Sequence, residues 1–421
     1  MFRKLLSLDE AKQILKKNFS PEPVGVERVF LSEAHDRVLA EDIMAPMDVP
    51  PFDRSTVDGY AVRAVDTFGA DEDRPVALKF CGQVSVGESP SVVVERGMAA
   101  EIATGAPLPK GVDAVVMVEY STRRDDDVFI HRPVSKRENM MEAGSDIRKG
   151  EKILEKHQRV SSREIGVLAA LGLTEVVVHK RPRVAILSTG AEIVEPGKRL
   201  PSGKIYDINA YAFSAAVLEC GGEPINLGII PDDRTQLKAA VKRALDSADA
   251  VITSGGVSVG PKDLIPQVVE TLGKPGVIIS GIAVKPGKPT TIAIVDGKPV
   301  FSLPGHPTSS LLMFHMIVRP IICKMAGRTE ETPFMFKAVA ATKMFPARGR
   351  RTFVMVNVTY DKTGKQLASP VPTGLSGAIT TLARADGFVE IPEKQQFIDV
   401  GTEINVYLFS KNKLPARAPL K

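Results

Sequence analysis

The spacing of apolar residues changes along the chain and divides it into regions of different structure. Apolar positions recur at helical spacing over residues 8–19, which predicts a short amphipathic helix. Between about 46 and 140, short β-like runs are separated by Gly, Pro and Asp, a pattern typical of a small all-β module. Helical spacing returns over 161–172 and ends at a glycine, as helices commonly do.

From about residue 181, predicted strands and helices alternate. Asp296-Gly297, within the last predicted strand region, predicts a hairpin turn. The alternation predicts a mostly parallel sheet with helices on both faces. The predicted strands are 181–189, 225–230, 249–256, 277–284 and 290–303, the last divided by the turn, and the predicted helices are 209–222, 235–248, 263–273 and 306–327.

β-type runs resume beyond about residue 330 and predict a C-terminal barrel or sandwich. The fold class is therefore a multidomain α/β and β protein: a central three-layer α/β domain, an inserted small β module and a C-terminal β-barrel-like domain. We expect four domains. Their boundaries are 1–45 with 141–180 (a discontinuous, partly helical N-terminal domain), 46–140 (the β module), 181–327 (α/β) and 328–421 (C-terminal).

Composition narrows the classes of protein that fit. The chain has 421 residues, of which 43% are hydrophobic and 25% charged, so wholesale disorder is excluded. Its net charge of +5 is too small for sequence-independent nucleic-acid binding unless it is concentrated. No apolar run is long enough for a membrane span, and no secretory signal is seen. Three isolated cysteines offer neither a disulfide framework nor zinc spacing, so we expect a cytoplasmic protein without nucleic-acid or membrane partners.

Three loops follow predicted strands at the edge of the sheet where α/β proteins bind ligands. They are Ser188–Glu192, Ser254–Asp263 and Leu303–Pro307. The Ser-Gly-Gly run would let backbone N–H groups approach a phosphate closely, at the start of a helix. The alternative is a Gly-rich turn in which Asp263 only complements the dipole of its own helix.

Lysines and turn aspartates provide further candidate chemistry. Lys285 and Lys288 lie three residues apart, and the preceding strand is expected to end on the same side of the sheet as the Gly-rich loop. They could form an oxyanion pocket or simply a solvated hairpin. Asp58-Gly59 and Thr104-Gly105 could be simple turns, and Asp53 and Asp58 could equally be metal ligands.

Eight motifs in this order resemble one known family. They are FDRSTVDGYAV, ATGAPLP, AGSDIRKG, STGAEI, NLGIIPDD, SGGVSVGPKD, KPGKP and LPGHP. Each is weak alone, but together they resemble the molybdopterin molybdenumtransferases, known as MoeA and, in animals, the E domain of gephyrin. The resemblance covers the whole chain, and the middle α/β domain resembles the adenylyltransferase of the same pathway (MogA).

The resemblance implies a magnesium-dependent reaction that inserts molybdenum from molybdate into adenylylated molybdopterin and releases AMP. It also implies an elongated homodimer whose cleft forms between subunits, with Asp58 of one chain facing Asp263 of the other. Contact with the pathway's adenylyltransferase is a further expectation. Tungstate could replace molybdate, since the two anions are nearly the same in size and charge.

Matching positions suggest roles for individual residues. Asp58, Thr104, Glu192 and Asp263 would be catalytic, with Asp58, Glu192 and Asp263 as the candidate Mg²⁺ ligands. Ala191, His306 and Arg54 depart from the common family residues, and His306 could alter pH dependence or anion choice. The implied substrate-binding residues are Asp146, Asp232, Ser254, Gly255, Gly256, Ser258, Lys285, Lys288, Pro304, Gly305, Pro307, Arg350 and Ser376.

Charge considerations agree with these residue types. Molybdate is a dianion that must approach a pyrophosphate, and two unit charges 4 Å apart repel by ~4 kcal/mol at an effective dielectric constant of ~20. Lys285, Lys288, Arg350 or Arg351 and Mg²⁺ could offset this repulsion.

Two other classes of function stay open. One is an adenylyltransferase-like or nucleotide-hydrolysing enzyme that uses only the α/β domain. The presence of the β module and the C-terminal domain argues against it. The other is a non-enzymatic scaffold of the gephyrin type, which would need an apolar groove for its partner.

Overall fold

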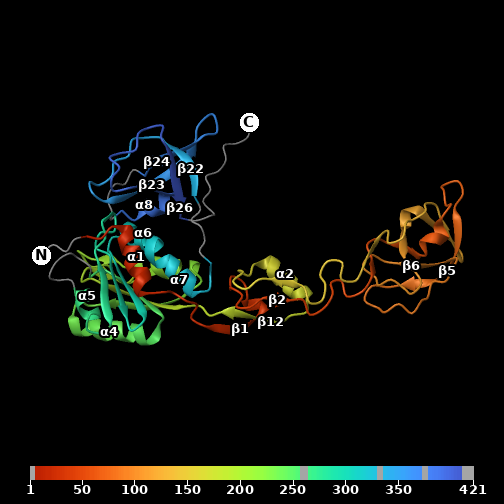
Figure 1. Cartoon of the computed structure of the whole chain (residues 1–421), viewed down its shortest axis with the longest axis horizontal. Helices are drawn as coiled ribbons and strands as arrows, with labels where there is room; N and C mark the ends of the chain where they lie inside the picture. The colour runs from red at the N-terminus through yellow and green to blue at the C-terminus, as the bar shows by residue number, and fades with distance from the viewer. Residues whose placement is uncertain (1–4, 257–263, 330–334, 372–377, 410–421) are drawn as a thin grey trace. The chain divides into compact units, whose positions relative to one another are not determined.

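The computed structural model describes residues 5–256, 264–329, 335–371 and 378–409 (Figure 1). The chain forms two compact units, which are described separately. The core unit comprises Met1–Glu27, Asp36–Val38 and Val178–Lys421, and the inserted unit comprises Arg28–His35 and Leu39–Val177. The boundaries of the four expected domains stay a prediction.

The core unit contains a six-stranded sheet in the order β16-β13-β17-β21-β20-β18. Neighbouring strands are parallel except where β20 pairs with β21 and β18, so the mostly parallel sheet is confirmed. Asp296-Gly297 joins β20 to β21, with Val295 opposite Lys298, as the turn signal predicts. The strands are β13 (Arg183–Thr189), β16 (Glu223–Ile230), β17 (Ala250–Ser254), β18 (Pro275–Ser280), β20 (Thr291–Val295) and β21 (Lys298–Leu303).

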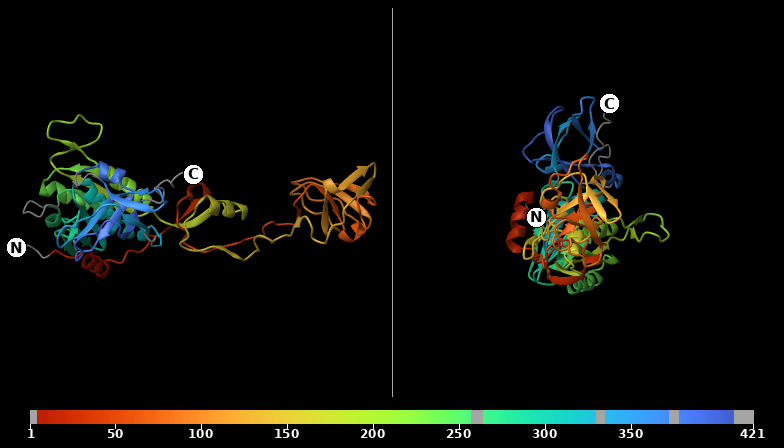
Figure 2. Two further views of the ribbon diagram at one scale, coloured as in Figure 1. Left: turned by 90° about the horizontal axis from the view of Figure 1, so that it is seen from above. Right: turned by 90° about the vertical axis from the view of Figure 1, so that its right-hand side faces the viewer.

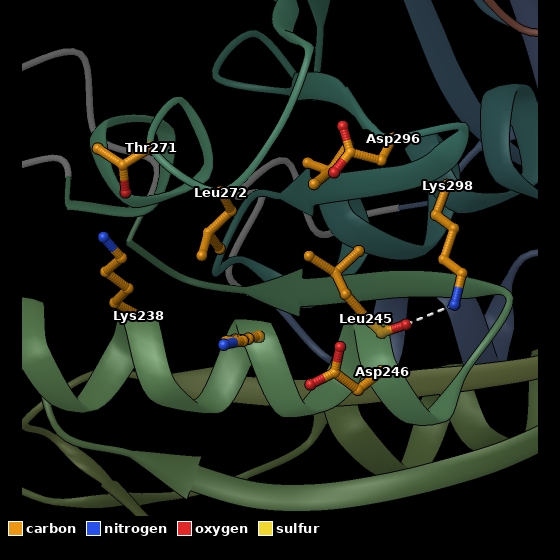
Figure 3. Close-up of a pocket in the computed structure, with 9 residues that line it drawn as sticks. Lys238, Leu245, Asp246, Thr271, Leu272, Asp296 and Lys298 are labelled. Atoms are coloured by element: carbon orange, nitrogen blue, oxygen red, sulfur yellow. Dashed lines mark hydrogen bonds between the residues drawn. The ribbon is translucent and has the colours of Figure 1, made fainter.

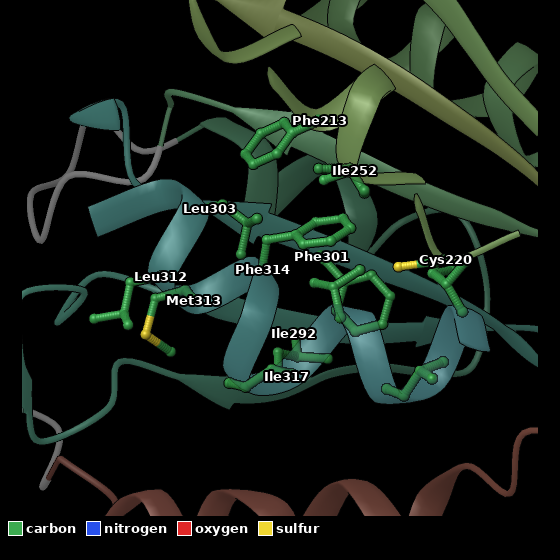
Figure 4. Close-up of a cluster of buried hydrophobic side chains, with 14 of the residues drawn as sticks. Phe213, Cys220, Ile252, Ile292, Phe301, Leu303, Leu312, Met313, Phe314 and Ile317 are labelled. Atoms are coloured by element: carbon green, nitrogen blue, oxygen red, sulfur yellow. The ribbon is translucent and has the colours of Figure 1, made fainter. Parts of the chain in front are cut away.

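Helices cover both faces of this sheet, which confirms the three layers. Alternate residues of β13 point to opposite faces: Val184 and Ile186 join the core under α1, α3, α6 and α7, while Ala185 and Leu187 join the core under α4 and α5. Figure 4 shows the first core, where Phe213 and Phe314 stack with ring centroids 5.8 Å apart. The helices are α1 (Leu8–Asn18), α3 (Asn209–Glu219), α4 (Arg234–Ser247), α5 (Leu264–Val269), α6 (Pro307–Met313) and α7 (Arg319–Met325).

Helix α1 begins at a capping box in which Ser7 and Glu10 bond reciprocally. It buries Leu8, Ala11 and Leu15 in the core of the α/β sheet. The amphipathic pattern predicts the helix but not the surface it covers, and the sequence reading groups it with the N-terminal domain instead.

Two helices differ from their predicted extents. Helix α5 ends at Val269 rather than 273. The long helix predicted over 306–327 is divided by a π-helical segment, η4 (Phe314–Val318), between α6 and α7. Pro320 explains the irregularity, because it has no N–H to continue the regular ladder.

Cys220 and Cys323 are both buried in the first core and are not joined by a disulfide. A hydrogen bond with Cys323, together with burial, raises the pKa of Cys220 far above its usual value. The isolated positions of these cysteines in the sequence give no sign that they meet.

The C-terminal strands form a closed barrel. The order β23-β24-β22-β26-β25 returns to β23 through an additional β23–β25 pairing, so the barrel expected from the sequence is present. A short strand, β19 (Val284–Lys285), extends this sheet beside β23. The barrel strands are β22 (Met335–Ala340), β23 (Arg351–Tyr360), β24 (Gln366–Pro370), β25 (Gly387–Ile391) and β26 (Glu403–Leu408).

The inserted unit contains a second six-stranded sheet in the order β7-β4-β6-β5-β9-β8, which confirms the small β module. Two short pairs, β3 with β10 and β2 with β11, form the ribbon that leads to it. The elements are β2 (Ile43–Met44), β3 (Arg54–Ser55), β4 (Gly59–Val62), β5 (Val76–Val84), β6 (Met98–Ile102), β7 (Ala114–Met117), β8 (Ser121–Arg124), β9 (Asp127–Ile130), β10 (Met140–Met141), β11 (Lys152–Leu154) and α2 (Ser162–Ala170), and β1 (Val26–Phe30) pairs with β12 (Glu175–His179).

In the described part of the chain, no helix has the length and apolar character needed to cross a membrane.

Candidate functional site

The three loops singled out from the sequence begin at one edge of the core unit's sheet. Ser188 lies opposite Ser254 in the β13–β17 pair, and Ser254 lies opposite Leu303 in the β17–β21 pair. The parallel register therefore brings the loops after Ser188, Ser254 and Leu303 side by side. This edge is the expected ligand-binding edge of an open α/β sheet.

Packing alone explains part of the glycine run. At Gly255, a Cβ atom would lie 2.2 Å from the backbone oxygen of Thr189, and φ is +86°. At Gly256, a Cβ atom would lie 2.9 Å from Ile265. Both residues must therefore be glycine whether or not a ligand binds, so the Gly-rich turn and the phosphate loop are compatible interpretations.

Hydrogen bonds connect the loops to one another. The Thr189 hydroxyl donates to Asp232, which lies in the loop after β16. The amide N–H of Gly255 donates to the carbonyl of Leu303 over 3.3 Å. The side chain of Asn209, the first residue of α3, donates to both Ser254 and Gly305.

Asn209 and its neighbour Asp207 are missed by the sequence reading. Both side chains are almost fully buried, and Asp207 accepts a hydrogen bond from the Ala210 N–H over 3.1 Å. Two polar residues, one at and one just before the start of an apolar helix, are the signal that could have identified them.

The remaining predicted residues at this edge differ in exposure. Glu192 and Gly305 are exposed, Pro304 is buried, and Pro307 begins α6. Ser254 is only 1% exposed, so its hydroxyl anchors the loop from beneath. Ser258, Asp263 and Ser376 lie outside the described residues.

The lysine loop follows β18, whose last residue, Ser280, pairs with the first residue of β20. The strand before the lysines therefore ends on the side of the Gly-rich loop, as expected. Three strand spacings separate β18 from β17, or roughly 14 Å. Lys285 is exposed and Lys288 is half-buried.

Lys285 is brought beside the start of β23. It pairs with Thr352, whose hydroxyl donates to the carbonyl of Arg350. Arg351, an alternative cation in the sequence reading, is instead held by carboxylates: its Nη2 lies 2.6 Å from Asp9 Oδ2, and Glu390 and Glu393 are also paired with it. Arg350 is therefore the better candidate for binding an anion.

In the inserted unit, Asp58 and Thr104 form a direct pair. The backbone N–H of Thr104 donates to Asp58 Oδ1 over 2.7 Å, and its hydroxyl donates to the same oxygen over 3.0 Å. These bonds, the backbone one first, lower the pKa of Asp58 below its usual value. Asp58 is thus an exposed, ionised carboxylate held in one orientation.

Gly59 explains why this carboxylate comes just before a central strand. A Cβ atom at Gly59 would lie 1.9 Å from the carbonyl oxygen of Val116, so only glycine allows β4 to lie this close to β7. A cavity of about 370 Å³ adjoins Asp58. Tyr60 and Glu101 are among its lining residues, and burial, with the nearby Glu101 charge, raises the pKa of Tyr60.

Asp146 and Asp53 lie along the ribbon rather than beside Asp58. The Asp146 N–H donates to the Val49 carbonyl over 3.1 Å, and Asp53 accepts from the Ala143 N–H over 2.7 Å. The Asp53 side chain therefore binds the backbone of the opposite strand of the ribbon. The structure does not bring Asp146 to the Asp58–Thr104 pair.

The candidate metal ligands do not form a cluster in the described residues, where no three His, Cys, Asp or Glu side chains are placed to hold a metal ion. Asp58 and Glu192 belong to different units, and Asp263 lies outside the description. A single exposed carboxylate such as Asp58 still suits Mg²⁺, which keeps most of its waters and adds substrate oxygens.

A second cavity, of about 470 Å³, lies at the opposite edge of the core unit's sheet (Figure 3). Lys238 and Lys242 of α4 line it together with Asp296 of the β20–β21 turn. Lys298 donates to the Leu245 carbonyl over 2.5 Å. None of the candidate catalytic, substrate-binding or metal-binding residues from the sequence lines it, so its size alone does not make it the active site.

Comparisons with known proteins cover nearly the whole chain. Family models match residues 6–172 (MoeA N-terminal region, domains I and II), 185–324 (probable molybdopterin binding domain) and 337–409 (MoeA C-terminal region, domain IV). The chain is 33% identical over 408 residues to the molybdopterin molybdenumtransferase of Haemophilus influenzae, covering 96% of this chain and 99% of that protein. It is 35% identical over 387 residues to that of Bacillus subtilis, covering 91% and 89%.

Solved structures agree with these sequence relatives. A molybdopterin biosynthesis MoeA protein from Pyrococcus horikoshii is 43% identical, with a TM-score of 0.84 and coverage of 97% of this chain and 100% of that one. A second such protein from this organism is 32% identical, with a TM-score of 0.78 and coverage of 96% and 100%.

Proposed function

Since the chain belongs to the MoeA family of molybdopterin molybdenumtransferases, we propose that it inserts molybdenum from molybdate into adenylylated molybdopterin and releases AMP. The transferase activity in molybdenum cofactor biosynthesis follows from the family. The adenylylated form of the substrate and the release of AMP are our proposals. The observation that supports both proposals is that three polar loops meet at the carboxyl edge of the α/β sheet. Such an edge suits a phosphate-bearing ligand.

Different residues at this edge would bind different anionic groups of the substrates. The N–H groups of Gly256 and Gly305 have no partner among the described residues and would bind the adenylate phosphate. Lys285, Lys288 and Arg350, at the side of the edge strand β18, would bind the molybdate oxygens. Separate cationic and N–H donors would hold two anionic groups apart and reduce the repulsion between them.

In the inserted unit, Asp58 would be the catalytic carboxylate, positioned by Thr104. Its lowered pKa keeps it ionised at neutral pH, so it can bind a cation or accept a proton. Mg²⁺, when bound, would supply charge neutralisation at the phosphate, and Asp58, Glu192 and Asp263 are the proposed ligands.

An assay of AMP release tests this function. The chain is incubated with adenylylated molybdopterin and Mg²⁺, with and without molybdate. Molybdate-dependent AMP release together with molybdenum in the pterin product is expected. AMP release without molybdenum insertion would indicate the nucleotide-hydrolysing alternative, and absence of both would indicate a scaffold. Omitting Mg²⁺ and replacing molybdate by tungstate in the same assay test the metal requirement and the anion choice.

We also propose that the chain is a homodimer. Helix α3 and Ile208, which precedes it, expose four apolar residues at helical spacing: Ile208, Tyr211, Ala215 and Leu218. The exposed fractions of Tyr211 and Leu218 are 50% each. The inner side of this helix is already buried in the core. The apolar residues on its outer side would be covered if a second copy of the chain packed against them. Light scattering should give twice the chain mass, and Leu218→Lys should lower it.

Complementation tests whether the two units act across such a dimer. Asp58→Asn chains and Asp263→Ala chains, each inactive, are unfolded and refolded together. If Asp58 of one chain works with Asp263 of the other, random pairing should restore about a quarter of wild-type activity. Heterodimers that form but remain inactive would show that both acids act within one chain.

Two further proposals follow from the family's place in its pathway. The chain would act in the cytoplasm and would contact the adenylyltransferase that supplies its substrate, without nucleic-acid or membrane partners. Cross-linking of the two purified enzymes, compared with and without molybdopterin, tests the contact.

A further inference from the structure

We propose that Asn209 is a positioning residue that fixes the distance between the Gly-rich loop and the proline loop at the phosphate-binding edge. This inference rests on the proposed function, since it assumes that a phosphate binds at that edge. Asn209 belongs to neither loop: it is the first residue of α3, on a third element of the chain.

The hydrogen bonds of Asn209 define its role. Nδ2 donates to Ser254 Oγ over 2.8 Å and to the Gly305 carbonyl oxygen over 2.7 Å. A carbonyl oxygen can only accept, so the amide group of Asn209 must face Gly305 with its nitrogen, and both N–H bonds are used. One planar group thus joins the end of β17 to the loop before α6.

Burial makes this connection rigid. Asn209 is 6% exposed and Ser254 is 1% exposed, so water cannot readily replace the bond between them, and the bond to Gly305 is partly buried. The Asp207 carboxylate accepts from the Ala210 N–H, which fixes the start of α3 and with it the Asn209 backbone. Because Ser254 is buried, its hydroxyl is an anchor for the loop and not a surface for the ligand.

The two loops that Asn209 joins carry the candidate phosphate donors. A Cβ atom built on Gly305 would lie 4.0 Å from the Gly255 Cα, so the loops are direct neighbours. The N–H groups of Gly256 and Gly305 have no partner among the described residues. Their separation, and therefore their fit to a tetrahedral phosphate, depends on the two Asn209 bonds, on the Gly255–Leu303 bond and on the β17–β21 pairing that ends at Ser254 and Leu303. Of these connections, the Asn209 bonds are the ones made by a side chain from outside both loops.

Asn209→Asp tests the inference with almost no change of shape. A carboxylate offers no donor, so it would repel the Gly305 carbonyl and release the proline loop. The full-length chain is titrated with AMP by calorimetry at pH 8. We expect AMP to bind at least tenfold more weakly, with a matching rise in KM for the adenylylated pterin and less than a threefold change in kcat.

The pH dependence separates positioning from simple destabilisation. A buried carboxyl group has a raised pKa and becomes a donor again when it is protonated. AMP binding by Asn209→Asp should therefore recover towards the wild-type level as pH falls from 8 to 5.5. Asn226→Asp is the matched control: Asn226 is exposed and only accepts a bond from the Gly228 N–H, so AMP binding should match that of the wild type at every pH.

Ser254→Ala provides a second test if Asn209→Asp does not fold. It removes one anchor and leaves the bond to Gly305, so AMP binding should weaken by a smaller factor than in Asn209→Ala. The double variant should be no weaker than Asn209→Ala alone, because the two residues act through one connection.

These experiments separate failure of the Asn209 inference from failure of the proposed molybdenumtransferase function. Unchanged AMP binding in a folded Asn209→Asp chain overturns the inference even if the wild type turns over. Weaker, pH-recoverable AMP binding supports it even if the wild type proves to be no molybdenumtransferase. A wild-type chain that does not bind AMP overturns the inference.

Discussion

The inserted unit and the core unit each pair a threonine with an aspartate, but the two pairs are built differently. In the inserted unit, Thr104 gives both its backbone N–H and its hydroxyl to Asp58. In the core unit, the buried Thr189 gives only its hydroxyl to Asp232. The same two residue types therefore hold a carboxylate through two bonds in one unit and through one in the other.

The difference lies in which group determines the position of the acid. The backbone N–H of Thr104 cannot be removed by changing its side chain, so Asp58 should stay in place in most variants. Asp232 depends on the Thr189 hydroxyl, and Thr189 also packs against Gly255 and Gly256. A change at Thr189 should therefore affect the whole phosphate-binding edge, whereas a change at Thr104 should affect only Asp58.

Asp58→Asn should have the largest effect. It removes the negative charge but keeps an oxygen to accept from Thr104, so we expect turnover to fall at least 100-fold with an unchanged melting temperature. Asp42→Asn is the matched control, because Asp42 is also exposed, accepts a backbone N–H (that of Lys156, at 2.7 Å) and has a lowered pKa. Near-normal turnover in a folded Asp58→Asn chain would remove Asp58 from the catalytic group.

Thr189→Val should have the next largest effect. The substitution keeps the shape of the side chain but leaves Asp232 without the hydroxyl, at a cost of about 1 kcal/mol in stability. We expect AMP binding to weaken about fivefold to tenfold, measured by calorimetry, while turnover at saturation changes little. Thr189→Ser restores the hydroxyl and should restore binding. A fall in kcat without a change in AMP binding would contradict this assignment.

Thr104→Val should have a smaller effect, of a few-fold in kcat. The backbone N–H, which is the larger cause of the lowered pKa of Asp58, remains. Loss of the hydroxyl should raise that pKa, so the acid limb of the kcat–pH profile should move to higher pH. Thr104→Ser should return the profile to that of the wild type. A 100-fold loss would show that the hydroxyl itself takes part in the reaction.

The smallest effect on activity is expected at His315 of η4, whose substitution should change stability alone. Burial, with a contribution from Arg319, lowers the pKa of His315 to about 4, from 6.5. The unfolded chain therefore binds a proton below pH 6.5 that the folded chain does not, so stability falls as pH drops from 6.5 towards 4. The full shift corresponds to about 3 kcal/mol, and less is expected because the side chain keeps some contact with solvent.

His315→Gln should flatten this acid loss, measured as the midpoint of urea unfolding at pH 7.5, 6 and 5. His35→Gln, at an exposed position, is the control and should follow the wild type. An equally steep loss in His315→Gln would assign the acid sensitivity to other groups.

The apolar pattern alone predicts most elements correctly, because it reflects which side of each element faces a core. The alternation from residue 181 predicts the parallel sheet and its two layers of helices. The same pattern cannot show which surface an element covers. Helix α1 is predicted as a helix, yet its packing on the α/β sheet is visible only in the structure.

The motifs likewise identify loops better than they identify side-chain partners. Gly255 is found because it belongs to a Gly-rich run after a predicted strand, and Asp232 because the family resemblance implies it. The strand register then brings their loops together. Asn209 lies in no such motif: with Asp207 it marks the start of an apolar helix, but a helix start does not show which loops its side chain will join. Its importance comes from two acceptors, Ser254 and Gly305, that lie 45 and 96 residues away along the chain.

The sequence by itself determined the classes of structure, the family and the loops that carry the chemistry, since these depend on local preference and on motif order. Only the tertiary structure decided the pairing of Asp58 with Thr104, the closure of the C-terminal barrel through β23 and β25, and the engagement of Arg351 by Asp9. The physical reason is that a hydrogen bond or ion pair forms where two groups come within about 3 Å of each other. Residues far apart in the chain reach that distance only through the packing of whole elements.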